Sequence, residues 1–144
     1  VLQLVDDPSA SLREAARVVR PGGRVVAVLA TAENDPDDEI GSILDGMRGL
    51  VRREGGLDHI ESVAPTNLRM IHRGHMPWQE FEGSAAEQIA LIERRSYSSL
   101  FDVDEDDWNR TVEPVLDRLR ALPGRDVSRR RRNRHPLVVW DVRG

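Results

Sequence analysis

Apolar and polar residues follow a helical spacing near the start of the chain. Four apolar residues fall at the positions of a single helix face: Leu12, Ala15, Ala16 and Val19. Just before them, the Asp7 carboxylate is placed to accept from the free amides of a first turn, and Pro8 suits the first helical position. The pattern predicts a helix from Ser9 to Arg20.

A turn and a fully apolar segment follow this helix. Pro21 cannot continue the helix, and Gly22 and Gly23 give the backbone the freedom that a tight reversal needs. Every residue from Val25 to Leu29 is apolar, which is typical of a strand with helices on both of its faces. The segment therefore predicts a central, parallel strand.

A second helical stripe lies in the middle of the chain. Its apolar residues are Ile40, Ile43, Leu44, Met47, Leu50 and Val51. The stripe follows Asp35-Pro36, which repeats the helix-start signal. It ends at Arg52 and Arg53, whose cations suit the negative end of a helix, and the pair Gly55-Gly56 comes next.

The segments after this helix predict two strands. Leu57 to Gly74 shows no clear period, and within it Leu68 to His72 predicts a short strand with Gly74 as a bulge. Met76 to Phe81 predicts another strand, which Pro77 confines to a sheet edge or a strand start.

Two helices precede the final strand. Ser84 and Glu87 form a capping box, which predicts a helix to about Arg95. Asp104 to Leu122 predicts a further helix, kinked or restarted at Pro114.

The remaining segment predicts a polar loop over Arg125 to Arg134 and a last strand over Leu137 to Val142, opened by Pro136. Helices between strands favour right-handed crossovers and a parallel sheet, so the fold class is α/β. The chain has 144 residues, enough for one ordinary domain, which we expect to span 1–144.

The sequence VLQLVDDPSASLREAARVVRPGGRVVAVL, at 1–29, resembles the middle of a class I S-adenosylmethionine-dependent methyltransferase, where "DP…L.E..RVLRPGG" joins two parallel strands. The segment Arg94 to Leu100, the acidic helix after it and His135 to Trp140 resemble a bacterial small-molecule branch of that family. The resemblance covers most of the chain.

The resemblance implies the C-terminal half of a doubly wound, Rossmann-like sheet. Val1 to Leu4 would end the fourth strand and Arg24 to Ala30 would be the fifth. The sixth lies within 68–81, the seventh, antiparallel strand is Leu137 to Val142, and residues 84–122 form a helical cap insertion. The family's glycine-rich cofactor loop and the acidic residue that holds the ribose have no counterpart here, so we expect poor binding of S-adenosylmethionine by this chain alone.

The resemblance also assigns site residues. Leu2, Gln3 and Leu4 match the strand end that contacts the cofactor, and Gln3 replaces the more usual His, which removes a proton-transfer role there. The alternative for Gln3 is a surface amide. No catalytic residue is expected, because methyl transfer is an in-line displacement in which positioning does most of the work.

The substrate pocket of the related branch is matched by Arg95 and Tyr97, with Trp78 as a wall. Arg95 can pair with an anionic group and Tyr97 can stack or hydrogen-bond. The alternatives are an Arg95 that is ion-paired with the acids of 102–107 and a Trp78 that belongs to the core.

Metal binding is not expected. His72 and His75 are three residues apart in an extended stretch without a carboxylate cluster. The acids of 33–39 do not fit an EF-hand, because Ile40 and Gly46 occupy its glycine and glutamate positions counted from Asp35. Helix-start electrostatics explains these acids better.

Charge and composition limit the partners. The net charge is −4, and no aromatic residues interleave with the arginines of 129–134, which favours a solvated loop balanced by the acids of 102–107 over a nucleic-acid contact. The chain has no cysteine and no apolar run of membrane length, so a cytoplasmic protein without a membrane partner is the default expectation.

Three function classes remain open at this point. The first is methyl transfer from S-adenosylmethionine to a small molecule. The second is a non-catalytic methyltransferase-like module, since a largely unpaired edge beside Val25 to Ala30 would favour self-association into a homo-oligomer. The third is an arginine-rich accessory protein that binds nucleic acid.

Overall fold

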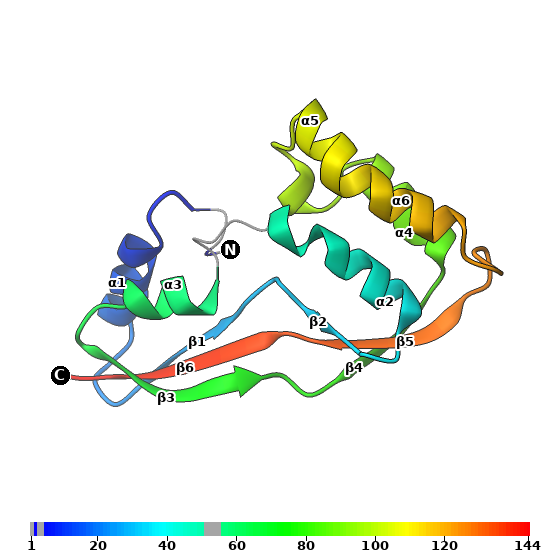
Figure 1. Ribbon diagram of the computed structural model, residues 1–144. Helices are drawn as coiled ribbons and strands as arrows, with labels where there is room; N and C mark the ends of the chain where they lie inside the picture. The colour runs from blue at the N-terminus through cyan, green and yellow to red at the C-terminus, as the bar shows by residue number, and fades with distance from the viewer. Residues whose placement is uncertain (1, 3–4, 51–55) are drawn as a thin grey trace. The chain divides into compact units, whose positions relative to one another are not determined.

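The computed structural model describes residues 2, 5–50 and 56–144, and the chain forms two compact units (Figure 1). Unit 1 is built from Val1–Glu33, Arg52–Pro77 and Arg134–Gly144, and unit 2 from Asn34–Val51 and Trp78–Asn133. Each unit has a hydrophobic core of its own. The chain is mixed α/β, and its described residues form two three-stranded sheets.

The first helix of unit 1 confirms its sequence signals. α1 spans Pro8–Val18, and the Asp7 side chain accepts from the Ala10 amide at 2.8 Å. Leu12 and Ala16 are buried on the predicted apolar face. The capped start and the apolar stripe therefore act together, one fixing where the helix begins and the other what it packs against.

The turn after α1 requires both of its glycines. Gly22 has a φ of 79°, in the left-handed region that disfavours a side chain. A Cβ on Gly23 would lie 2.5 Å from Val19 Cγ1 and 2.9 Å from the Arg20 carbonyl oxygen. The chain can reverse this tightly, from helix into strand β1 (Arg24–Val28), because neither position carries a side chain.

The sheet of unit 1 has the order β1-β6-β3. β6 (Pro136–Val142) is antiparallel to β1 and to β3 (Leu68–His75), so β1 and β3 run parallel to each other on either side of it. The last strand is thus antiparallel, as expected. The expectation of parallel pairing for Val25 to Leu29 is wrong for the described residues, where β1 forms an antiparallel ladder with β6.

One face of this sheet packs against α1 and α3 (Leu57–Ser62), which lie on the same side of it (Figure 1). The buried core contains Leu12, Ala16, Leu29, Ile60, Leu68, Val138, Trp140 and Val142. On β1, Val25 and Ala27 pack against this core, whereas Val26 and Val28 are 58% and 51% exposed. Burial of both faces of this strand was therefore a wrong expectation, because only one face has a helical layer in the described chain.

Two smaller details of unit 1 differ from the prediction. The irregularity of β3 lies between Met70 and His72 rather than at Gly74. α3 was not foreseen, because its six residues are too few to establish a clear period.

Unit 2 packs a small sheet against helices. The sheet has the order β2-β5-β4, with β2 at Glu33–Asn34, β5 at Arg129–Arg134 and β4 at Gln79–Gly83, and β4 is antiparallel to β5. The helical segments are α2 (Glu39–Leu44), a 3-10 helix (Asp45–Leu50), α4 (Ala85–Glu93), a 3-10 helix (Ser98–Leu100), α5 (Glu105–Asp107), a π turn (Trp108–Val112) and α6 (Glu113–Arg120). These helices fall partly within the predicted insertion, 84–122. The buried core contains Ile40, Ile43, Met47, Ala85, Ile92, Leu100, Val112, Val115, Leu116 and Leu119.

The helix signals of unit 2 are largely confirmed. The Ser84 hydroxyl accepts from the Glu87 amide at 3.2 Å, and the Glu87 carboxylate accepts from the Ser84 amide at 2.7 Å. The break expected at Pro114 is the π turn, which ends two residues before that proline. α2 begins three residues after Pro36, with Asp38 as its N-cap residue, and the predicted helix end at Arg52 and Arg53 lies outside the described residues.

The predicted polar loop over 125–134 is wrong, because its second half is strand β5. Glu80 faces Arg132 and Phe81 faces Arg131 across the ladder with β4. Consecutive arginines are poor strand formers by composition alone. They form a strand here because carboxylates neutralise four of them, namely Arg129, Arg131, Arg132 and Arg134.

We expect Gly23→Ala to lower the free energy of unfolding by about 1–3 kcal/mol, because the new methyl group meets Val19 and a backbone oxygen. Urea unfolding followed by circular dichroism measures the change. Gly49→Ala is the matched control, since a Cβ there has no atom within 4 Å, and it should change stability by less than about 1 kcal/mol. Equal effects of the two substitutions would show that the turn does not depend on this close approach.

Candidate functional site

Arg95 forms hydrogen bonds within the loop that follows α4. Its Nη1 donates to the carbonyls of Leu100 and Val103, both at 2.8 Å, and its guanidinium lies 4.5 Å from the centre of the Trp108 ring. The acids of 102–107, which were the alternative partners, are not among its described contacts. The side chain thus closes the segment between α4 and α5.

Tyr97 packs against the core of unit 2. Its hydroxyl donates to the Gln88 Oε1 atom at 2.5 Å. Burial raises the pKa of Tyr97, and the nearby Arg131 charge offsets part of that rise. The phenol is therefore held neutral and oriented toward α4.

Trp78 contacts a side chain of strand β5. The Arg132 guanidinium lies 5.1 Å from the centre of the Trp78 ring. The contacts described for Tyr97 and Arg95 are instead with α4 and with the segment between α4 and α6.

The predicted cofactor residues are only partly described. Leu2 is half-buried and packs against the core of unit 1. Gln3 and Leu4 lie outside the described residues. The contact predicted between these residues and S-adenosylmethionine stays a prediction.

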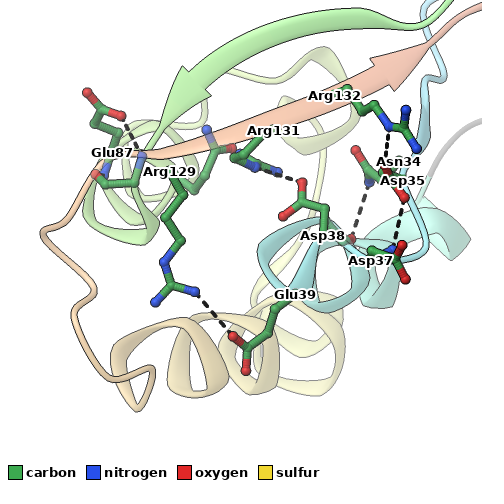
Figure 2. A network of polar contacts seen from close by, with 12 residues as sticks. Asn34, Asp35, Asp37, Asp38, Glu39, Glu87, Arg129, Arg131 and Arg132 are labelled. Atoms are coloured by element: carbon green, nitrogen blue, oxygen red, sulfur yellow. Dashed lines mark hydrogen bonds and ion pairs between the residues drawn. The ribbon is translucent and has the colours of Figure 1, made fainter.

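A ladder of ion pairs joins β5 to the acidic segment 33–39 (Figure 2). The pairs are Arg129–Glu39 at 3.2 Å, Arg131–Asp38 at 2.8 Å, Arg132–Asp35, and Arg134–Glu33 at 2.7 Å. The expectation that the acids of 102–107 balance these arginines is wrong for these four, whose acids come from residues 33–39, the last of which begins α2. This ladder explains the arginine run without a nucleic-acid partner.

The central pair of the ladder is buried. The side chains of Arg131 and Asp38 are 3% and 8% exposed, and the Arg131 guanidinium also lies 5.1 Å from the centre of the Phe81 ring. A neighbouring carboxylate, Asp35, accepts from the Asp37 amide at 3.0 Å, and this bond together with Arg132 lowers the pKa of Asp35. These contacts fasten the start of α2 to the sheet of unit 2.

A second polar arrangement lies in unit 1, where β1 and β3 end and β6 begins. Leu29 follows β1, and its carbonyl oxygen lies 2.9 Å from His135 Nδ1. Just past the end of β3, the Met76 amide donates to the His135 carbonyl at 2.8 Å. Because β6 is antiparallel to both strands, His135 lies at the carboxyl ends of both, where open α/β sheets bind ligands.

The Glu33 carboxylate lies between a histidine and an arginine at the same edge of unit 1. His75, the last residue of β3, has its Nε2 atom 3.1 Å from Glu33 Oε2, and Arg134 donates to both oxygens of Glu33 at 2.7 and 3.1 Å. The side chains of His75 and Glu33 are 34% and 36% exposed, so this edge is open to solvent.

From the sequence, His75 is a candidate only for metal binding, and His135 is not a candidate site residue. The described residues contain no group of three or more metal-ligating side chains. The signal that marks His135 is its place directly before a final strand that runs antiparallel. That order brings the start of the strand to the carboxyl ends of its neighbours.

Comparison with protein-family models and with curated proteins finds no match to this chain. Among the described residues, no helix has the length and apolar character needed to cross a lipid bilayer.

We expect Asp38→Ala to destabilise the protein by about 3–5 kcal/mol, because it leaves the Arg131 charge buried without its partner. The double variant Asp38→Ala/Arg131→Met should recover much of that loss in urea unfolding. Glu14→Ala is the control, since it breaks an exposed pair with Arg17 and should leave the urea midpoint close to that of the parent protein. A double variant no more stable than Asp38→Ala would contradict burial of the charge as the cause.

Proposed function

We propose that this chain takes part in methyl transfer from S-adenosylmethionine to a small-molecule acceptor, as the part of a class I methyltransferase domain that follows the cofactor loop. The observation that carries the proposal is the fold of 7–28 as a capped helix, a glycine turn and a strand. The antiparallel final strand β6 between β1 and β3 also supports it.

The described residues do not by themselves fit the cofactor. A nucleoside site of this kind uses glycines where a strand turns into a helix, because the backbone must approach the ligand closely. Gly22 and Gly23 instead join helix α1 to strand β1, and Gly56 only precedes the short helix α3. In this proposal, residues outside this sequence bind S-adenosylmethionine.

This chain would then contribute the acceptor side of the site. The carboxyl ends of β1 and β3 offer His75, Glu33 and His135 as polar groups near a bound substrate. Arg95, Tyr97 and Trp78 stay predicted substrate contacts. Since Arg95 already donates to two carbonyls, an anionic group would have to use its remaining donors.

Calorimetry with S-adenosylhomocysteine tests the proposal on two proteins, the 144-residue chain and a full-length protein that contains it. We expect heat of binding for the full-length protein and none for the chain. ATP is the control ligand, because it shares the adenosine but not the amino-acid portion. Failure of the full-length protein to bind S-adenosylhomocysteine would overturn the proposal, and binding by the chain alone would contradict the division of roles.

A second candidate function, self-association, is favoured by the free side of β1. The Gly23 carbonyl and the Leu29 amide bond to β6, so the alternate residues Arg24, Val26 and Val28 direct their backbone groups to the other edge. β1 is terminal in its sheet among the described residues. An edge of this kind can pair with the same edge of a second copy about a twofold axis.

We expect Val26→Lys to weaken this self-association, because a lysine on an edge strand opposes pairing with another strand. Light scattering after gel filtration, at tens of micromolar protein, should show a dimer for the parent chain and a monomer for the variant. Val18→Lys is the control, since Val18 is 65% exposed and belongs to helix α1 rather than to the edge strand. A parent chain that is monomeric throughout would remove this candidate.

A further inference from the structure

The His135 ring is held in one proton arrangement by a backbone group. A carbonyl oxygen only accepts hydrogen bonds, so at 2.9 Å from the Leu29 oxygen the Nδ1 atom of His135 must carry the proton. In the neutral ring the lone pair then belongs to Nε2. Nε2 forms no hydrogen bond with any residue that the structure describes.

Hydrogen bonds also fix the backbone at His135 and Pro136. The Met76 amide donates to the His135 carbonyl at 2.8 Å, and the Leu29 amide donates to the neighbouring Pro136 carbonyl at 3.0 Å. The ring is half-buried. These bonds fix an imidazole with a basic Nε2 atom at the carboxyl ends of β1 and β3.

The charged groups at this edge come from three elements. Glu33 of β2 lies between His75 of β3 and Arg134 of β5, which precedes His135 in the chain. Arg134 pairs with the Glu33 carboxylate through two hydrogen bonds, so the two charges largely offset each other. The edge therefore has no large excess charge of either sign from these groups that would oppose a proton on His135.

We propose that His135 accepts the proton that a substrate's acceptor group loses when it is methylated, an inference that rests on the proposed function. S-adenosylmethionine would supply the methyl group: the bond between its sulfur and the methyl carbon would break with the electron pair staying on sulfur, S-adenosylhomocysteine would leave, and the acceptor oxygen or nitrogen would bond to that carbon. The O–H or N–H bond of the acceptor breaks, its electron pair stays on the acceptor atom, and the proton binds to the lone pair of Nε2. The Nδ1–H bond to Leu29 stabilises the resulting imidazolium. The substrate class is thus a hydroxyl compound or an amine that must lose a proton.

Two variants separate this role from a structural one. In His135→Asn the amide nitrogen replaces Nδ1 and can keep the bond to Leu29, but Nε2 is lost. His135→Phe loses both. We expect both variants of the full-length protein to lose about 100-fold or more in kcat/KM, with S-adenosylhomocysteine binding unchanged. His72→Asn, at an exposed position of β3, is the control and should retain the parent rate.

The assay uses radiolabelled S-adenosylmethionine with a panel of phenols and primary amines, including 4-nitrophenol, at several pH values. The rates of the parent protein and of His135→Asn should depend differently on pH, because only the parent offers Nε2 as a proton acceptor. 4-Nitrophenol is already ionised at mildly alkaline pH, so His135→Asn should slow its methylation less than that of unsubstituted phenol.

A measurement without turnover completes the test. Long-range proton–nitrogen NMR of the neutral protein should show a protonated Nδ1 and an unprotonated Nε2 for His135. The reverse arrangement, or His135→Asn within twofold of the parent rate while His135→Phe is slow, would overturn this inference and leave the proposed function standing. No binding of S-adenosylhomocysteine, or no methylation across the panel, would overturn both.

Discussion

The pairing of β6 with two strands that run the other way is the constraint on which unit 1 depends. Its inward side chains, Val138, Trp140 and Val142, are at most 4% exposed and form the centre of the core beneath α1 and α3. Removing a strand with two neighbours would leave two rows of backbone donors and acceptors unpaired. The loss in free energy of folding would be far larger than the contribution of any single surface contact. The same pairing brings His135 to the carboxyl ends of both neighbours. The position of β6 between β1 and β3 therefore determines both the core of unit 1 and the place of the candidate base.

Unit 2 is held by a different kind of force. Its helices bury aliphatic side chains, but the strand beneath them consists almost entirely of arginines. That strand exists because guanidinium groups meet carboxylates from residues 33–39 and the faces of Phe81 and Trp78. The exposed ion pairs of the ladder contribute little to stability. The buried pair makes Asp38 indispensable to Arg131, because loss of one partner would leave an uncompensated charge in the interior. The acidic segment is thus a structural counterpart to the arginine run.

Local signals in the sequence predicted the elements better than their arrangement. Asp7 with Pro8, the Gly22-Gly23 turn and the box of Ser84 with Glu87 each act within a few residues, and each formed as expected. The pairing of Val25 to Leu29 depends on which strands are neighbours, and an apolar run cannot show that. β5 was missed because its stability comes from residues about ninety positions earlier. His135 was missed for a related reason, since its contact with Leu29, 106 residues earlier, exists only because β6 and β1 are neighbours in the sheet.

Arg95 shows how a side chain can determine its own backbone. Among the described residues it alone adopts a positive φ without being glycine, at 52°. Judged by backbone preference, glycine would suit the position better. Glycine would nevertheless lose the two bonds to the carbonyls of Leu100 and Val103 and the contact with Trp108. At this position the backbone conformation favours glycine, whereas the side-chain hydrogen bonds favour arginine. Replacement of Arg95 by glycine would therefore relax the backbone and at the same time free the segment between α4 and α5.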